Sequence, residues 1–120
     1  MSETFKELLL NIQIDMLDIC FEYANKNAEK IYVYCSYEQD SIFCNFFYLV
    51  KGGFLKKHKL DVDVSPDRQR KVLKILNNDV EKIIELCKEN KEPMPTEIKI
   101  VYDVQSKSLS TDYKYNLVHY

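Results

Sequence analysis

The stretch KIYVYCSYEQDSIFCNFFYLV, residues 30–50, decides the fold. β-branched and aromatic residues alternate with their neighbours along residues 30–37, and this period of two predicts a strand. The polar residues 38–41 predict a turn, and residues 42–50 predict a second strand. The stretch therefore predicts an antiparallel hairpin, the first part of a β-meander.

The register of this hairpin concerns two of the four cysteines. The cysteines are Cys20, Cys35, Cys44 and Cys87. No two of them are spaced like zinc-knuckle ligands, which argues against a metal site. If the hairpin pairs symmetrically about its turn, Tyr37 faces Ile42 and Cys35 faces Cys44. An oxidising compartment would allow a disulfide there, whereas in a reducing cytosol we expect packed, reduced thiols.

Three more strands follow from the same kind of pattern. Residues 51–53 (Lys-Gly-Gly) predict a tight turn in which glycine takes positive φ, and residues 54–60 predict a third strand. Residues 96–104 and 109–117 alternate around a polar turn at 105–108 and predict a closing hairpin.

Two segments have the period of an amphipathic helix. Along residues 4–24, apolar residues recur at steps of three and four, and Thr4 with Glu7 fits a capping box. The pair Ser65-Pro66 is a typical helix start, and the helix it opens runs to about Asn90, before two prolines.

The predicted order is helix, three strands, helix, two strands. This order predicts an α+β fold, a two-layer sandwich in which both helices pack on one face of a five-stranded antiparallel sheet. The chain of 120 residues has room for one core, so we expect residues 1–120 to form a single domain.

Composition restricts the class of protein. The net charge of −2 gives no overall reason to expect nucleic-acid or acidic-membrane binding. No apolar run approaches the roughly 18 residues that span a membrane, and the first residues lack the pattern of a secretory signal. We therefore expect a cytoplasmic protein with no membrane partner.

Catalytic patterns are weak in this sequence. Nucleophilic catalysis needs a nucleophile held by a base, and the two histidines, His58 and His119, stand in a basic run and near the end of the chain. Gly52-Gly53 lacks the Lys-Ser/Thr of a phosphate loop. We expect no enzyme activity, no metal and no cofactor, with a small enzyme or ligand-binding domain as an alternative.

Charge is distributed unevenly along the chain. In residues 2–25, five acidic residues stand against one lysine, a formal charge of −4. This strip has two interpretations. It is either a solvated helix face with no binding role or a docking surface for a basic partner. The strand tyrosines Tyr113 and Tyr115 have the same two interpretations, sheet packing or interface.

A basic region supports a third interpretation. Residues 51–59 hold four lysines and no acid. Nucleic-acid binding is therefore an alternative, in which lysines contact phosphates and aromatic rings stack on bases. Against this alternative, the aromatic residues alternate as core residues should, and the chain is acidic overall.

Several short motifs together resemble a known family. They are a leading amphipathic helix, EKIYVY at 29–34, FFY at 46–48, KEP at 91–93, YDV at 102–104 and TDYKY at 111–115. In this order they resemble the YezG-like antitoxin (immunity protein) family of Gram-positive bacteria. The resemblance implies a non-enzymatic intracellular protein that binds and neutralises the nuclease domain of a secreted polymorphic toxin, as part of a toxin–antitoxin pair.

The resemblance also favours the docking interpretation of the acidic strip, because nuclease domains are commonly basic where they hold phosphates. We expect the cognate toxin nuclease domain to be the partner, without direct nucleic-acid binding, and a homodimer stays open as an alternative. The predicted contact residues are Glu7, Asp15, Asp18 and Glu22, with Tyr113 and Tyr115 as weaker candidates.

Overall fold

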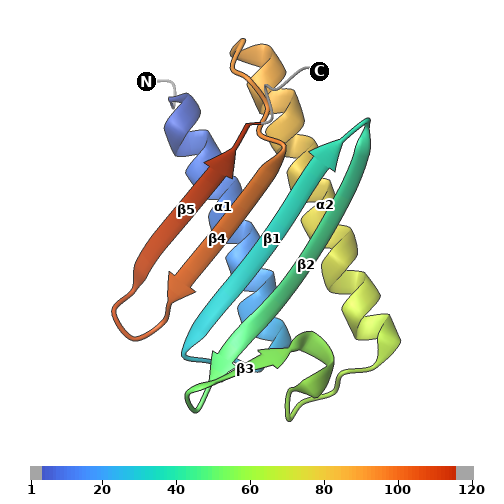
Figure 1. Cartoon of the computed structure of the whole chain (residues 1–120), viewed down its shortest axis with the longest axis vertical. Coiled ribbons are helices and arrows are strands. Elements are labelled where there is room, and N and C mark those ends of the chain that lie inside the picture. Colours follow the sequence, from blue (N-terminus) through green and yellow to red (C-terminus); the bar gives the residue numbers. More distant parts are fainter. Residues whose placement is uncertain (1–3, 116–120) are drawn as a thin grey trace.

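The helices and strands follow each other in the predicted order. The computed structural model of the chain describes residues 4–115. Its elements are α1 (Phe5–Tyr23), β1 (Lys30–Glu38), β2 (Ser41–Val50), β3 (Gly53–Lys56), the 3-10 helix η1 (Lys57–Lys59), α2 (Pro66–Glu89), β4 (Glu97–Asp103) and β5 (Ser108–Lys114). Figure 1 shows two layers, with α1 and α2 packed behind one face of the sheet. The predicted α+β fold class is confirmed.

The sheet is antiparallel throughout. Its five strands lie in the order β3-β2-β1-β4-β5, so β1 is central and β3 and β5 form the edges. The long helix α2 carries the chain from β3 at one edge to β4 on the other side of β1 (Figure 1).

Both helices begin at the predicted capping residues. Thr4 Oγ1 accepts a hydrogen bond from the backbone N–H of Glu7 at 3.2 Å. Ser65 Oγ accepts one from the backbone N–H of Arg68 at 3.4 Å, and Pro66 is the first helical residue. Each cap satisfies a backbone donor that the helix itself leaves unpaired, a contribution of about 1 kcal/mol.

The hairpin register predicted for β1 and β2 is confirmed, but the turn is tighter. Tyr37 pairs with Ile42 and Cys35 with Cys44, and the ladder continues to Glu38 and Ser41. Only residues 39–40 remain in the loop, both with positive φ (51° and 62°). Two consecutive positive φ values match the twist of antiparallel strands, which explains the extended pairing.

The prediction of a third strand at 54–60 is wrong in its second half. β3 ends at Lys56, and Lys57–Lys59 form a 3-10 turn. Two contacts fix Lys57 in this turn. The Tyr23 hydroxyl donates to the Lys57 carbonyl at 2.9 Å, and the Lys57 ammonium donates to Asn45 Oδ1 at 2.7 Å. Such long-range contacts override a local strand pattern.

The closing hairpin is also shorter than predicted. β5 ends at Lys114, and Tyr115 follows the strand. Residues 116 and 117, the end of the predicted strand, lie outside the described part of the chain.

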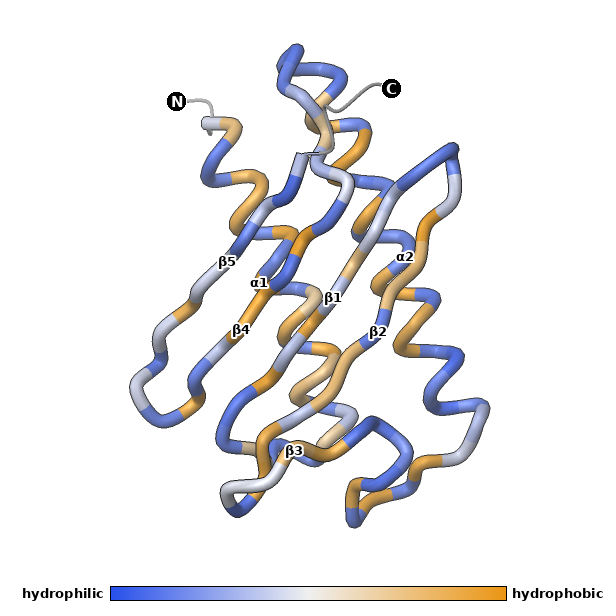
Figure 2. Tube along the Cα trace, viewed as in Figure 1, coloured by the Kyte–Doolittle hydropathy of each residue, from blue (hydrophilic) through white to orange (hydrophobic). Residues whose placement is uncertain are grey.

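The core lies between the helices and the sheet. Figure 2 shows hydrophobic residues alternating with more hydrophilic ones along β1, whereas β2 is hydrophobic over most of its length. The largest fully buried side chains of the core include Met16, Tyr23, Phe46, Tyr48, Leu76 and Ile83. Each contributes roughly 1.5–3 kcal/mol through the apolar surface removed from water. The buried Tyr48 hydroxyl donates to the Cys20 carbonyl, so its polar tip is satisfied.

Candidate functional site

The predicted acidic strip lies on the outer side of α1. Glu7, Asp15, Asp18 and Glu22 are all exposed. The opposite side of the helix packs into the core through Met16 and its neighbours. The helical period places Met16 and the acidic residues on different sides of α1, but Leu10 and Ile14 are exposed together with the acidic residues.

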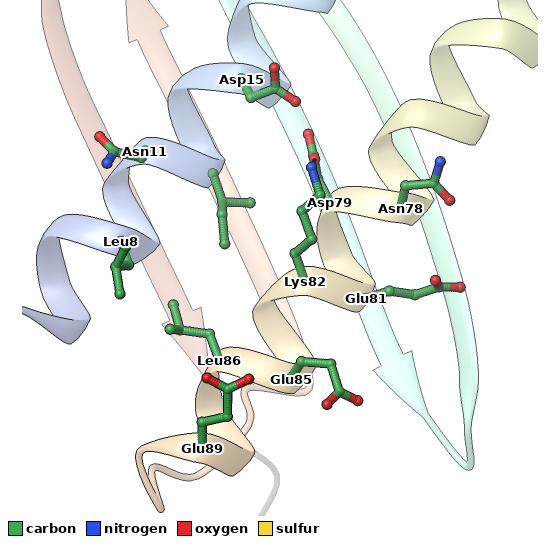
Figure 3. Close-up of a pocket in the computed structure, with 11 residues that line it drawn as sticks. Leu8, Asn11, Asp15, Asn78, Asp79, Glu81, Lys82, Glu85, Leu86 and Glu89 are labelled. Atoms are coloured by element: carbon green, nitrogen blue, oxygen red, sulfur yellow. Dashed lines mark ion pairs between the residues drawn. The ribbon is translucent and has the colours of Figure 1, made fainter. Parts of the chain in front are cut away.

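One member of the strip, Asp15, lines a groove between α1 and α2. The groove has a volume of about 780 Å³. Figure 3 shows Leu8, Asn11 and Asp15 on the α1 side, opposite residues of the second half of α2. The α2 residues that line it are Asn78, Asp79, Glu81, Lys82, Glu85, Leu86 and Glu89. Glu7, Asp18 and Glu22 continue the acidic surface along α1 outside this lining.

The groove is strongly acidic. Five carboxyl groups and one ammonium line it, those of Asp15, Asp79, Glu81, Glu85, Glu89 and Lys82. Lys88, outside the lining, lies 4.0 Å from Glu85, but both side chains are exposed and such a pair contributes little. The negative potential of the α1 strip therefore extends across the groove onto α2.

Asp79 is the unusual member of this set because it is only 1% exposed. Its Oδ1 lies 3.4 Å from the Lys82 ammonium. Its Oδ2 is buried, and no donor group of the described residues bonds to it. The carboxyl groups of Asp79 and Asp15 point toward each other across the groove (Figure 3).

This environment changes the acidity of Asp79. Burial, followed by the neighbouring Asp15 carboxyl group, raises the pKa of Asp79 to about 7 against the opposing effect of Lys82. The cause is that a second negative charge and a dry environment both disfavour the carboxylate form. Sequence reasoning missed Asp79, although its position gave a signal. It stands three residues after Leu76 and four before Ile83, which places it on the apolar side of the helix.

The two predicted tyrosines lie away from the groove. Tyr113 faces α1, where its hydroxyl accepts a hydrogen bond from the Gln13 side-chain amide. Thr111 donates to the other end of the same amide at 3.1 Å. Tyr115 borders a small cavity of about 30 Å³ with Phe5 and residues of the loop after α2. The structure therefore does not bring Tyr113 and Tyr115 together with Asp15.

The uncovered face of the sheet carries aromatic rings. Tyr32 stacks on Phe47 with ring centroids 4.8 Å apart, and Phe54 lies 5.4 Å from Tyr32. Tyr34 and Phe43 form a further pair at 6.3 Å. Phe43 is 56% exposed and Phe54 67% exposed.

The sequence analysis interpreted the alternating aromatic residues as core residues, and this interpretation is wrong for those on the uncovered face. Only one half of the alternation, which includes Phe46 and Tyr48, faces the helices. The other half faces away from the helix layer. An alternating pattern separates two faces of a sheet, but it does not say which face is covered when both are aromatic.

The basic run does not form a uniform patch. His58 and Lys59 are exposed, whereas Lys57 is partly buried and lies over the Phe46 ring at 5.7 Å from its centroid. Desolvation by burial, and then the charge of Lys56, lowers the pKa of Lys57. His119 lies outside the described residues.

Residues 4–115 also bear on metal binding and membrane insertion. In this range no three His, Cys, Asp or Glu side chains are grouped so that they could hold a metal ion. Neither of the two described α-helices combines the length and hydropathy needed to cross a membrane. In comparisons with known proteins, no family model matches the chain, and no curated protein matches it either.

Proposed function

We propose that this chain is an immunity protein that binds a basic protein, the nuclease domain of a secreted bacterial toxin. The observation that carries the proposal is the acidic groove between α1 and α2, together with the exposed strip that contains Asp15 and Asp18. The resemblance of the sequence motifs to the YezG-like family supports the identity of the partner.

The physical reason is complementarity of charge. A nuclease domain holds phosphates with lysine and arginine side chains, so its substrate surface is positive. Carboxylates on the inhibitor attract that surface over about one Debye length, roughly 8–10 Å at physiological ionic strength, and orient the encounter. A bound inhibitor then occupies the surface that the nucleic acid would need.

The first test is co-expression with the C-terminal domain of the toxin encoded immediately upstream. We expect the chain to restore growth and to co-purify with that domain. Growth arrest despite expression of the folded chain, together with no co-purification, would refute the proposal.

The second test addresses the surface. Reversing two charges in D15K/D18K should slow association with the toxin domain and flatten its dependence on salt. A matched control is E38K/D112K, which changes the net charge equally at two exposed positions away from the helix layer. Equal association rates for the two double variants would show that net charge, and not this surface, matters.

A second candidate function has one specific observation in its favour. The exposed ring of Phe54 and the half-buried rings of Tyr32 and Phe47 lie beside Lys56 on the uncovered sheet face. Such an arrangement can stack bases of a single strand. Fluorescence anisotropy of a labelled oligonucleotide tests it. Binding that weakens steeply with salt and is lost in F54A would favour this function.

A further inference from the structure

We propose that the Asp15–Asp79 pair anchors one arginine of the bound partner, whose guanidinium enters the groove and donates to both carboxyl groups. This inference rests on the proposed function, and it adds the chemistry of the central contact.

The first argument is that Asp79 lacks the partners a buried carboxylate needs. A buried charge is costly unless charge-assisted hydrogen bonds compensate it. Lys82 reaches only Oδ1, at 3.4 Å, and its side chain is 65% exposed. Oδ2 accepts no hydrogen bond from the described residues. A donor from outside the chain would complete the site.

The second argument is that packing does not require a carboxyl group at this position. Val80 and Ile83, the neighbours of Asp79 on the buried side of α2, are apolar. An apolar or amide side chain of similar size at position 79 would avoid the cost of burying the charge. Residues that reduce the stability of the free protein are typical of binding sites.

The third argument concerns the shape of the ligand. Leu8, Ile12 and Leu86 supply apolar walls to the groove, which suit the aliphatic stem of a long side chain. The planar guanidinium can donate to two carboxyl groups at once, whereas an ammonium is a compact point charge. Glu81, Glu85 and Glu89 lie on the α2 side of the entrance and attract a cation before contact.

A metal ion is a weaker match to the same carboxyl groups. The divalent cations that prefer oxygen take six or more ligands. In residues 4–115, no group of three potential ligand side chains surrounds this point. The two carboxyl groups suit one organic cation from a partner protein better.

The inference predicts that binding is coupled to a proton. Below neutral pH the free protein keeps a proton on the pair, because burial and Asp15 raise the pKa of Asp79. An arriving guanidinium needs both carboxylates ionised, so the proton leaves. The groups that face Asp79 are Asp15 on α1, Lys82 on α2 and the Cys35 thiol on β1. Affinity should therefore fall by up to about tenfold per pH unit below pH 7.

The test uses the full chain and the same toxin domain. D79N is nearly isosteric, and it should weaken binding at pH 8 at least about tenfold while remaining folded. It should also lose most of the pH dependence. The matched control D112N makes the same change at an exposed position outside the groove lining, and we expect a change below about threefold.

A double-mutant cycle then identifies the arginine. Alanine is placed at each surface arginine of the toxin domain, and each variant is combined with D79N. One arginine should lose most of its effect in the D79N background. Normal binding by D79N, with impaired binding by D15K/D18K, would overturn the anchor and leave the proposed function intact. Absence of binding by the unaltered chain would overturn both.

Discussion

The sulfur atoms of Cys35 and Cys44 lie 3.5 Å apart, on neighbouring strands and on the side that faces the helices. All four cysteines are reduced and buried. The pair follows directly from the hairpin register, and it shows that the predicted pairing of β1 and β2 is correct.

Thiol reactivity should be low in the folded protein. The hydrogen bond with Cys44, followed by burial, raises the pKa of Cys35, and burial also raises the pKa of Cys20 and Cys87. Because the thiolate is the reactive form, we expect a disulfide reagent such as DTNB to react at least about 100-fold more slowly with native than with denatured protein. The denatured protein should release four equivalents. Rapid native labelling would contradict the buried placement.

The stability should depend on pH through Asp79. Its pKa is raised from 3.8 to about 7 on folding. Between these values the folded state holds a proton that the unfolded state has lost, so this group's contribution to stability falls as pH rises through the window and is constant above it. D79N removes the effect. Urea titration measures the free energy of unfolding of D79N and of the unaltered protein at pH 5 and pH 8. The difference in favour of D79N should be roughly 2–4 kcal/mol larger at pH 8 than at pH 5.

Asp15, Lys82 and Cys35 face Asp79, and all three residues are also present in D79N. The comparison at two pH values therefore separates the titration of Asp79 from the other effects of the substitution. An identical difference at pH 5 and pH 8 would show that the carboxyl group titrates normally.

Gln13 should be important for holding β5 against α1. Its side chain is buried, and it bonds both Thr111 and Tyr113. Q13A removes both bonds and leaves two partly buried hydroxyl groups without this partner. We expect a loss of about 1–3 kcal/mol in the free energy of unfolding, measured by urea titration. Q105A, at an exposed turn, should change it by less than about 0.5 kcal/mol.

Phe46 and Phe47 are neighbours in the chain but lie on opposite faces of the sheet. Phe46 is 1% exposed beneath the helices, and Phe47 lies on the uncovered face. F46A should cost about 3–5 kcal/mol because it leaves a cavity in the core. F47A should cost about 1 kcal/mol, since it loses mainly ring contacts at a partly exposed site. Equal losses on urea unfolding would mean that both faces are covered in solution.

Local sequence features predicted most of the fold. The caps at Thr4 and Ser65 and the alternation along β1 need only near neighbours, so the backbone preferences of a short segment reveal them. The third strand was predicted too long because Tyr23 and Asn45, distant in sequence, bind Lys57 and fix it in a 3-10 turn.

The sequence predicted the α1 side of the candidate site but not the α2 side. The spacing of Glu7, Asp15, Asp18 and Glu22 showed an outward acidic strip, which the structure places on the surface of α1. Tyr113 illustrates the opposite case, because its hydroxyl is occupied by Gln13 from another element.

The sequence by itself determined the elements, their order and the register of the central hairpin, because periodicity and turn residues act over a few positions. Only the tertiary structure decided which sheet face the helices cover and which helix faces meet. The contact between Asp15 and Asp79 depends on that choice. The free energy of burying a side chain depends on everything packed around it, and those neighbours come from distant parts of the chain.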